Sequence, residues 1–171
     1  MKKVFLLIVG LVFLLPVAAV PIFAVQLEEG RQGTLGCGGN HRRRLGGTEL
    51  TFTSYTFRNF NTDRTLIIDD IKIFAADGTT LANFPPFPAG FNNVLGPNQT
   101  TPFSTLDIFG TADVAPTPIQ LVVNWRTADD RKGLQLWGTF GRQDRERDPS
   151  TNNLLEQRTR GPVWCATLKL R

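Results

Sequence analysis

The chain of 171 residues has few of the side chains that bind metals or act as nucleophile and base. It contains two cysteines, Cys37 and Cys165, and one histidine, His41. Structural zinc sites need about four ligands and catalytic sites about three, yet these residues form no paired-cysteine motif. No serine lies in a G-x-S-x-G context, and a Ser-His-Asp triad would depend on His41 alone. We therefore expect no metal, no cofactor and no catalytic residues.

Acidic residues are also sparse and scattered. Asp69 and Asp70 are adjacent, so on a regular strand their side chains would face opposite sides and could not act as a carboxylate pair. Either could join Asp63 or Asp77 at a loop edge, but no loop has the dense acidic ligands of an EF-hand. The sequence therefore gives little support to a calcium site.

The first 26 residues contain the long apolar run of the chain. Two lysines are followed by an uncharged stretch from Val4 to Gln26. A basic start, an apolar stretch and a small residue at Ala24 predict a secretory signal peptide over 1–24. The run is also long enough to cross a bilayer, so an uncleaved anchor is the alternative. Under either interpretation the rest lies outside the cytoplasm. We expect a secreted, periplasmic or extracellular protein that meets a membrane only if this segment is retained.

Net charge gives no sign of a nucleic-acid partner. The formal charge is +4, and loss of the two leader lysines leaves 17 basic against 15 acidic residues. The basic residues form two groups, one over Arg42–Arg44 and one over 142–161. The second group is interleaved with Asp144, Glu146 and Asp148, which is typical of a solvated surface rather than a phosphate-binding track. We expect no nucleic acid.

Cys37 has four conceivable roles: lipid carrier, metal ligand, nucleophile or disulfide partner. A charged segment separates it from the apolar run, which argues against lipidation. A zinc site with His41 and Cys165, or a nucleophile using His41 as base, would lack a recognisable motif. Two cysteines in an exported chain usually pair. We therefore predict a disulfide between Cys37 and Cys165 that attaches a glycine-rich N-terminal segment to the last strand, with His41 and Arg42–Arg44 on the surface nearby.

Alternating apolar and polar residues predict strands along the rest of the chain. Ile119, Leu121, Val123 and Trp125 share one strand face, and the Asp77–Gly78 pair indicates a hairpin turn. No stretch after residue 26 has a helical period. About seven short antiparallel strands indicate an all-β sandwich or barrel. The expected strands cover 49–57, 64–74, 75–81, 100–109, 119–125, 133–140 and 162–170.

Four short motifs give this pattern a resemblance. They are Y-x-F-x-N-F-N over 55–61, I-x-I-F-x-x-D-G over 71–78, L-G-P-N-Q-T-T-x-F over 95–103 and V-V-N-W over 122–125. Between Thr48 and Trp125 the chain resembles immunoglobulin-like sandwich modules of bacterial envelope proteins. The resemblance implies an antiparallel immunoglobulin-like sandwich over 48–171, preceded by a glycine- and arginine-rich segment over 25–47. The cysteine and tryptophan spacing departs from that of antibody-type domains.

Two segments are candidates for partner binding. "NFPPFPAGFNNV" concentrates aromatic rings among prolines, either to cap an open end of the sandwich or to expose an aromatic patch. Residues 142–161 form either a mobile charged hairpin tip or a recognition arm, because long loops in compact domains are usually functional or disordered. The candidate contact residues are Phe84, Phe87, Phe91, Arg142, Arg145, Arg147, Arg158 and Arg160.

These features favour an exported, non-enzymatic β-sandwich with a binding or envelope-structural role. Its partner would be a protein or a glycan of the envelope. The alternative is a secreted hydrolase or carbohydrate-active enzyme, which a polar pocket with two convergent carboxylates would support. A ligand-transporting barrel is a third class, which would require a closed sheet around an apolar cavity.

Overall fold

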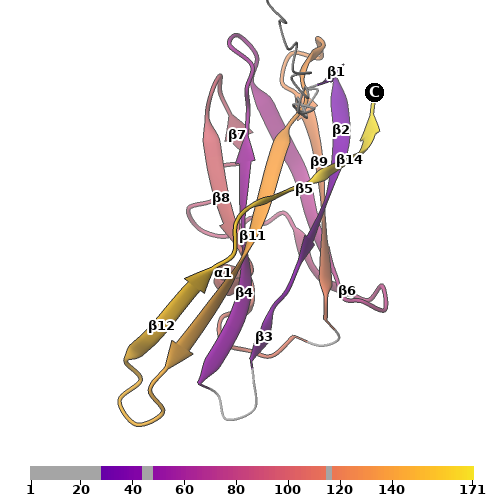
Figure 1. Cartoon of the computed structure of the whole chain (residues 1–171). Helices are drawn as coiled ribbons and strands as arrows, with labels where there is room; N and C mark the ends of the chain where they lie inside the picture. The colour runs from indigo at the N-terminus through magenta and orange to yellow at the C-terminus, as the bar shows by residue number, and fades with distance from the viewer. Residues whose placement is uncertain (1–27, 44–47, 115–116) are drawn as a thin grey trace, which may run out of the picture.

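A computed structural model describes residues 28–43, 48–114 and 117–171. The predicted leader over 1–24 and Arg44 lie outside the described residues. The strands pair antiparallel throughout, and one short helix, α1 (Thr105–Phe109), interrupts them. The chain is therefore an all-β antiparallel sandwich, as the alternation predicted (Figure 1). No helix in these ranges is long and apolar enough to span a membrane.

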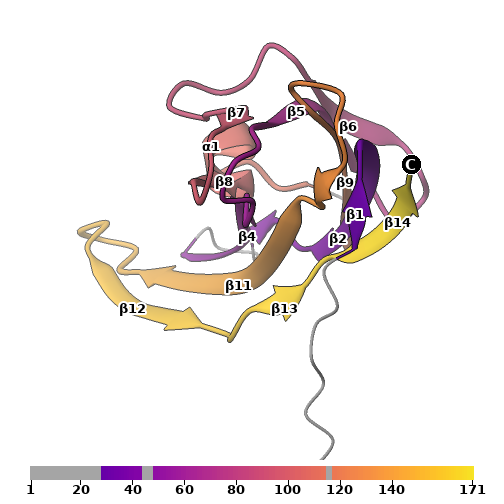
Figure 2. The ribbon, with the colours of Figure 1, turned by 90° about the horizontal axis from the view of Figure 1, so that it is seen from above.

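Two six-stranded sheets form the sandwich (Figure 2). The path of sheet I is β12 (Leu154–Thr159), β11 (Trp137–Arg147), β4 (Glu49–Arg58) and β3 (Arg42–Arg43), with β8 (Thr100–Ser104) and β13 (Val163–Trp164) beside it. The path of sheet II is β14 (Ala166–Leu170), β2 (Gln32–Gly39), β9 (Ile119–Thr127), β5 (Leu66–Phe74) and β6 (Thr80–Phe84), with β7 (Val94–Leu95) beside it. A separate two-stranded ribbon pairs β1 (Glu29–Gly30) with β10 (Gly133–Leu134).

The core lies between the two sheets. The alternating residues of β9 behave as predicted: Leu121 and Val123 are fully buried, and Trp125 is 1% exposed. Tyr55 and Phe57 of β4 meet them from sheet I. The hairpin turn at Asp77–Gly78 is also confirmed, because it joins β5 to β6 and its glycine has φ of 87°.

The described part of the segment over 25–47, residues 28–43, is not separate from the sheets. We expected it to lie ahead of a sandwich that begins at residue 48. β2 instead lies between β14 and β9, and it pairs with β9 along its whole length and with β14 from Gly33 to Gly36. Its glycines allow the backbone to pass close to neighbouring side chains. At Gly39, a Cβ atom would collide with the Tyr55 hydroxyl.

A bulge in β5 overturns the expected arrangement of Asp69 and Asp70. The register with β9 shifts between Ile68 and Asp70, and both Ile68 and Ile71 are fully buried. The extra residue keeps the isoleucines on the core face and turns both aspartates outward. Asp69 contacts Arg126 at 3.0 Å. Asp70 accepts a hydrogen bond from the Asn124 side chain at 2.9 Å.

Helix α1 is the second departure from the predicted strands. We expected one strand over 100–109, but β8 ends at Ser104 and a helical turn follows. The Ser104 hydroxyl accepts a hydrogen bond from the Leu106 N–H at 3.1 Å, which caps the helix. Gly110, with φ of 58°, ends it. Five residues are too few to show a helical period in the sequence.

Candidate binding surfaces

Cys37 and Cys165 form a disulfide, as predicted, with their Cα atoms 4.5 Å apart. Cys37 lies on β2 of sheet II and is 2% exposed. Cys165 lies between β13 and β14, where the chain passes from sheet I to sheet II. The disulfide therefore links β2, the first long strand, to the point where the C-terminal segment crosses from sheet I to sheet II. With both sulfur atoms bonded, neither cysteine is a metal ligand or a nucleophile in this state.

The expectation that His41 lies on the surface is wrong. Its side chain is fully buried, its Nδ1 lies 3.0 Å from the Thr105 hydroxyl, and its ring meets the edge of Phe109. Its Nε2 has no hydrogen-bond partner among the described residues. Burial lowers the pKa of His41, although nearby carbonyls and Asp113 act in the opposite direction. The ring packs under α1, which the sequence pattern did not reveal.

The surroundings of His41 offer no metal site. Arg42 and Arg43 are exposed on β3, beside β4 and not beside the last strand as we expected. Within the described ranges, no group of three or more histidine, cysteine or acidic residues is placed to hold a metal ion. His41 therefore acts as a buried packing residue in this structure.

The predicted phenylalanine segment packs onto the end of the core. The rings of Phe84 and Phe91 meet Phe103 edge-on at 5.8 and 5.5 Å, and Phe87 stacks on Phe91 at 5.0 Å. All three are only partly exposed and contact the core cluster. This geometry favours the capping interpretation over an exposed aromatic patch.

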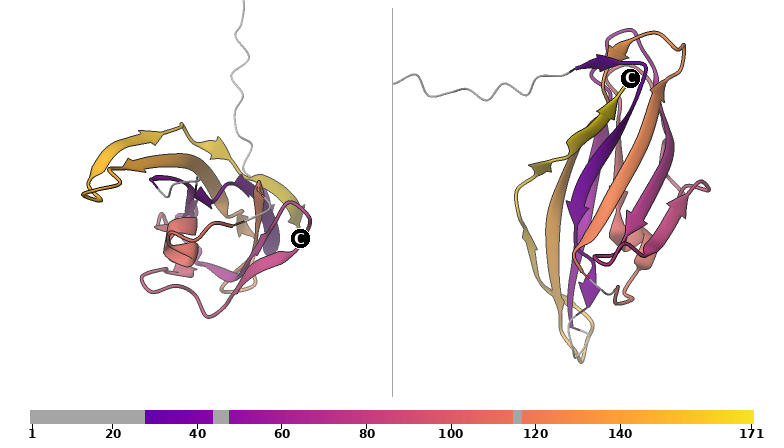
Figure 3. Two further views of the ribbon diagram at one scale, coloured as in Figure 1. Left: turned by 90° about the horizontal axis from the view of Figure 1, so that it is seen from below. Right: turned by 90° about the vertical axis from the view of Figure 1, so that its right-hand side faces the viewer.

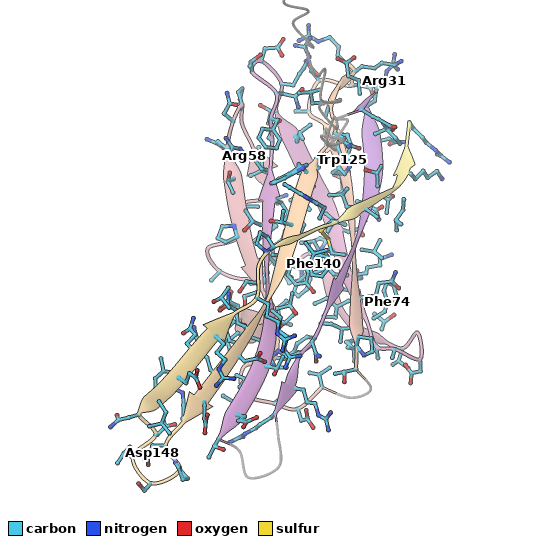
Figure 4. All side chains as sticks on the ribbon, in the orientation of Figure 1. Arg31, Arg58, Phe74, Trp125, Phe140 and Asp148 are labelled. Carbon is cyan, nitrogen blue, oxygen red and sulfur yellow. A yellow bond between two sulfur atoms is a disulfide. The ribbon has the colours of Figure 1, made fainter. Side chains whose placement is uncertain are left out.

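The predicted arginine loop is mostly a β-hairpin. β11 continues to Arg147, and β12 returns along it from Leu154. The hairpin projects from one end of the sandwich with Asp148 at its tip (Figures 3 and 4). Asp148 accepts hydrogen bonds from Ser150 and Thr151, which close the turn and lower its pKa to about 2. The sequence shows no alternating pattern here because β12 is exposed to solvent on both faces.

A groove of about 450 Å³ lies along this hairpin and the adjoining end of β4. It collects four of the five predicted arginines, whereas Arg147 bonds to the Asn152 carbonyl near the tip. The groove contains as many acidic as basic side chains. Its charged lining is Arg142, Arg145, Arg158 and Arg160 together with Glu49, Asp144, Glu146 and Glu156.

Two of the groove carboxylates, Asp144 and Glu156, are paired with arginine rather than prepared for acid catalysis. Burial by itself would raise the pKa of Asp144, but hydrogen bonds from Thr51 and Arg142 outweigh it and the pKa is lowered. The hydrogen bonds from Arg158 lower the pKa of Glu156. A general acid working near neutral pH needs a raised pKa. These two carboxyls shift in the opposite direction.

The outer face of sheet I carries an aromatic row that the sequence analysis missed. Trp164 of β13 lies with its ring centroid 4.1 Å from that of Trp137 on β11. Trp137 meets the edge of Phe60 at 5.1 Å, and the Arg58 guanidinium lies 4.5 Å above the Phe60 ring. We call Arg58, Phe60, Trp137 and Trp164 the aromatic row. Trp164 is 52% exposed. Pairing of β11 with β4 and β13 brings these distant residues together, so no local motif could indicate them.

Exposed apolar side chains are concentrated on the C-terminal part of the chain. Six large hydrophobic residues in the described ranges are exposed, and only Val94 lies outside 154–168. The other five follow β12, β13 and β14 along one side of both sheets (Figure 2). They are Leu154, Leu155, Val163, Trp164 and Leu168.

Comparison with known protein families, with curated proteins and with solved structures returns no match.

Proposed function

We propose that this protein is an exported, non-enzymatic β-sandwich that binds a partner protein of the cell envelope through the aromatic row. The observation that carries the proposal is the half-exposed indole of Trp164 packed on Trp137. Large contiguous apolar patches are uncommon on the surface of monomers unless they serve an interaction. Tryptophan and arginine are also the residue types most enriched at the energetic centres of protein interfaces.

The surroundings of the row favour a protein over a glycan. Exposed Leu168 on β14 continues the apolar side of the chain toward sheet II, whereas Val163 pairs with Phe140 and points to the other face of sheet I from Trp164. Aliphatic side chains extend a protein interface but add no ring face on which a sugar could stack. Neither the groove along the hairpin nor the groove beside Trp125 includes a residue of the aromatic row. Small-molecule sites are typically concave.

Export is supported by the leader pattern and by the disulfide. Disulfides persist mainly in oxidising compartments outside the cytoplasm. The immunoglobulin-like character of the module remains part of this proposal and rests on the four motifs quoted above. Export is tested by intact-mass measurement of the protein recovered from outside the cytoplasm. We expect an N-terminus between about residues 20 and 27. A mass that retains Met1 would contradict cleavage and support the anchor.

Binding is tested by comparing Trp164→Ala with Val94→Ala, which removes an exposed apolar side chain from β7. Proteins captured from an envelope extract by the wild type are identified, purified and titrated against all three forms. We expect Trp164→Ala to weaken the interaction about 30-fold or more, as for an interface centre, and Val94→Ala to leave it unchanged. Equal affinity for all three forms would refute the aromatic row as the binding face. Binding to purified envelope glycan that depends on Trp164 would replace the protein partner by a glycan.

A further inference from the structure

The outermost strand of sheet I has an open edge. β12 pairs with β11 on one side, and no other described strand pairs with it. All six of its residues are exposed, and the hairpin holds it away from the body of the sandwich (Figure 3). Natural proteins commonly protect such edges with proline, charged side chains, bulges or a covering element, because an open edge is a template for another strand. β12 contains no proline and is covered by nothing in the described residues.

The direction of the free hydrogen-bonding groups follows from the pairing with β11. The N–H of Arg160 donates to the carbonyl of Arg142 at 2.9 Å. Antiparallel strands alternate between residues that bond to the partner and residues that do not. The register is regular from Glu156 to Thr159. Glu156 and Arg158 therefore direct their backbone groups toward β11, and Gln157 and Thr159 direct theirs to the open edge.

This alternation limits how two copies of β12 could pair across a two-fold axis. Hydrogen bonds between the two copies can form only between residues whose backbone groups point to the open edge. Every second residue is of this kind, so the two-fold axis must coincide with a residue position and cannot fall midway between two residues. An axis at Glu156 would place two glutamates opposite each other, and an axis at Arg158 would place two arginines opposite each other. An axis at Gln157 places Glu156 of each copy opposite Arg158 of the other. Like charges opposed in a sheet destabilise it, whereas opposite charges stabilise it.

We propose that β12 is a self-association edge that pairs antiparallel with β12 of a second copy, with Gln157 at the two-fold axis. Glu156 and Arg158 then form two equivalent pairs at positions that are not hydrogen bonded, where facing side chains come closest. Within one copy these residues already contact each other, Arg158 donating to Glu156 at 2.7 Å, on a fully accessible strand. Dimerisation exchanges the two local contacts, one in each copy, for two contacts between copies. A closed two-fold contact uses the same surface on both partners.

The association is weak because the matching stretch is short. A register shift between Glu146 and Arg147 marks a bulge opposite Leu155, which ends the regular edge. The interface is therefore small, as in transient complexes. This inference does not rest on the proposed function, because β12 and the aromatic row are separate surfaces. A partner could bind the row whether or not the edges pair.

The test uses sedimentation velocity of the exported, disulfide-bonded protein over a range of concentrations. We expect the wild type to show a reversible monomer–dimer equilibrium. Glu156→Arg and Arg158→Glu each place like charges across the axis, so each variant alone should remain monomeric at concentrations where the wild type dimerises. Mixed together they should dimerise, because every pair across the axis then joins opposite charges. The double exchange of Glu156→Arg with Arg158→Glu should restore self-association.

Two further measurements make the outcome decisive. Thermal unfolding of each single variant should match the wild type, which excludes loss of folding as the cause. Gln157→Cys should form a disulfide-linked dimer on oxidation, because hydrogen-bonded partners lie about 5.5 Å apart between Cα atoms and a disulfide spans that distance. Ser150→Cys at the hairpin tip is the control and should link poorly. A wild type that stays monomeric, or a dimer that ignores the charge changes, would overturn the proposal.

Discussion

The hydroxyl of Tyr55 donates a hydrogen bond to the carbonyl of Gly38 at 3.1 Å. Tyr55 belongs to sheet I and is 1% exposed, whereas Gly38 belongs to β2 of sheet II. The bond thus joins the buried hydroxyl of a sheet I residue to a backbone carbonyl at the exposed Gly38 of sheet II. Burial raises the pKa of Tyr55 well above its usual range, so the phenol stays protonated and remains a donor.

The residue beside this contact tolerates no side chain. A Cβ at Gly39 would collide with the Tyr55 hydroxyl and come within 3.1 Å of Ile119. We expect Gly39→Ala to lower the free energy of unfolding by about 1–3 kcal/mol through overpacking. Gly161→Ala is the matched control, because nothing lies within 4 Å of its Cβ position. Denaturant unfolding measures both variants, and equal stabilities would contradict the close approach of β2.

The sequence pattern was reliable where one strand face is buried and the other is wet. Leu121 and Val123 of β9 alternate with polar or partly exposed neighbours, so their burial follows from a period of two. The cysteine pairing followed from their number and from the leader, without any knowledge of topology. Neither conclusion required knowing which strands are neighbours.

Features that depend on neighbouring strands were missed. The bulge at Asp69 changes the phase of β5 without changing its composition, so strict alternation assigned the two aspartates to opposite faces. The sequence of β12 was interpreted as part of a loop because both faces of the strand are solvated and show no alternation. The aromatic row needs β13 beside β11, and β13 is only two residues long. The alternation of apolar and polar residues predicts which residues of one strand are buried, but it does not indicate which strands pair side by side.

Removal of the disulfide should weaken the fold without changing it. Cys37 and Cys165 are separated by 128 positions, and closing so long a loop stabilises the folded state by about 5 kcal/mol in the chain-entropy model. Measured losses are commonly about 2–5 kcal/mol. We expect the double variant Cys37→Ala with Cys165→Ala to lose that much, measured by urea unfolding. Thiol counting on denatured, non-reduced exported protein should find no free thiol, and two free thiols would contradict the bond.

Leucines on the hairpin and in the core should respond differently to truncation. Leu155 is 59% exposed on β12, whereas Leu136 is fully buried. We expect Leu136→Ala to lower the free energy of unfolding by about 2–5 kcal/mol, through lost burial and a cavity. Leu155→Ala should change it by about 0.5 kcal/mol or less. A large loss at Leu155 would show that the hairpin packs against another part of the chain.

Protonation of His41 should make the protein less stable in mild acid. Burial lowers the pKa of His41 in the folded state, so the unfolded chain binds the proton more readily, with a pKa near 6.5. Stability rises with pH wherever the unfolded state binds more protons, so it should be complete above about pH 6.5 and fall as the pH drops below that value. The slope for one proton is at most about 1.4 kcal/mol per pH unit.

The measurement is urea unfolding between about pH 5.5 and 8, a window that lies above the usual pKa range of carboxyl groups. His41→Gln removes the titrating ring and should give a flatter dependence on pH, whatever its effect on stability at neutral pH. Asp113→Asn is the informative second variant, because the Asp113 charge favours the protonated ring. Its loss should lower the pKa of His41 further. An NMR titration that places the pKa of His41 in the folded protein at or above 6.5 would show that the ring is not desolvated under α1.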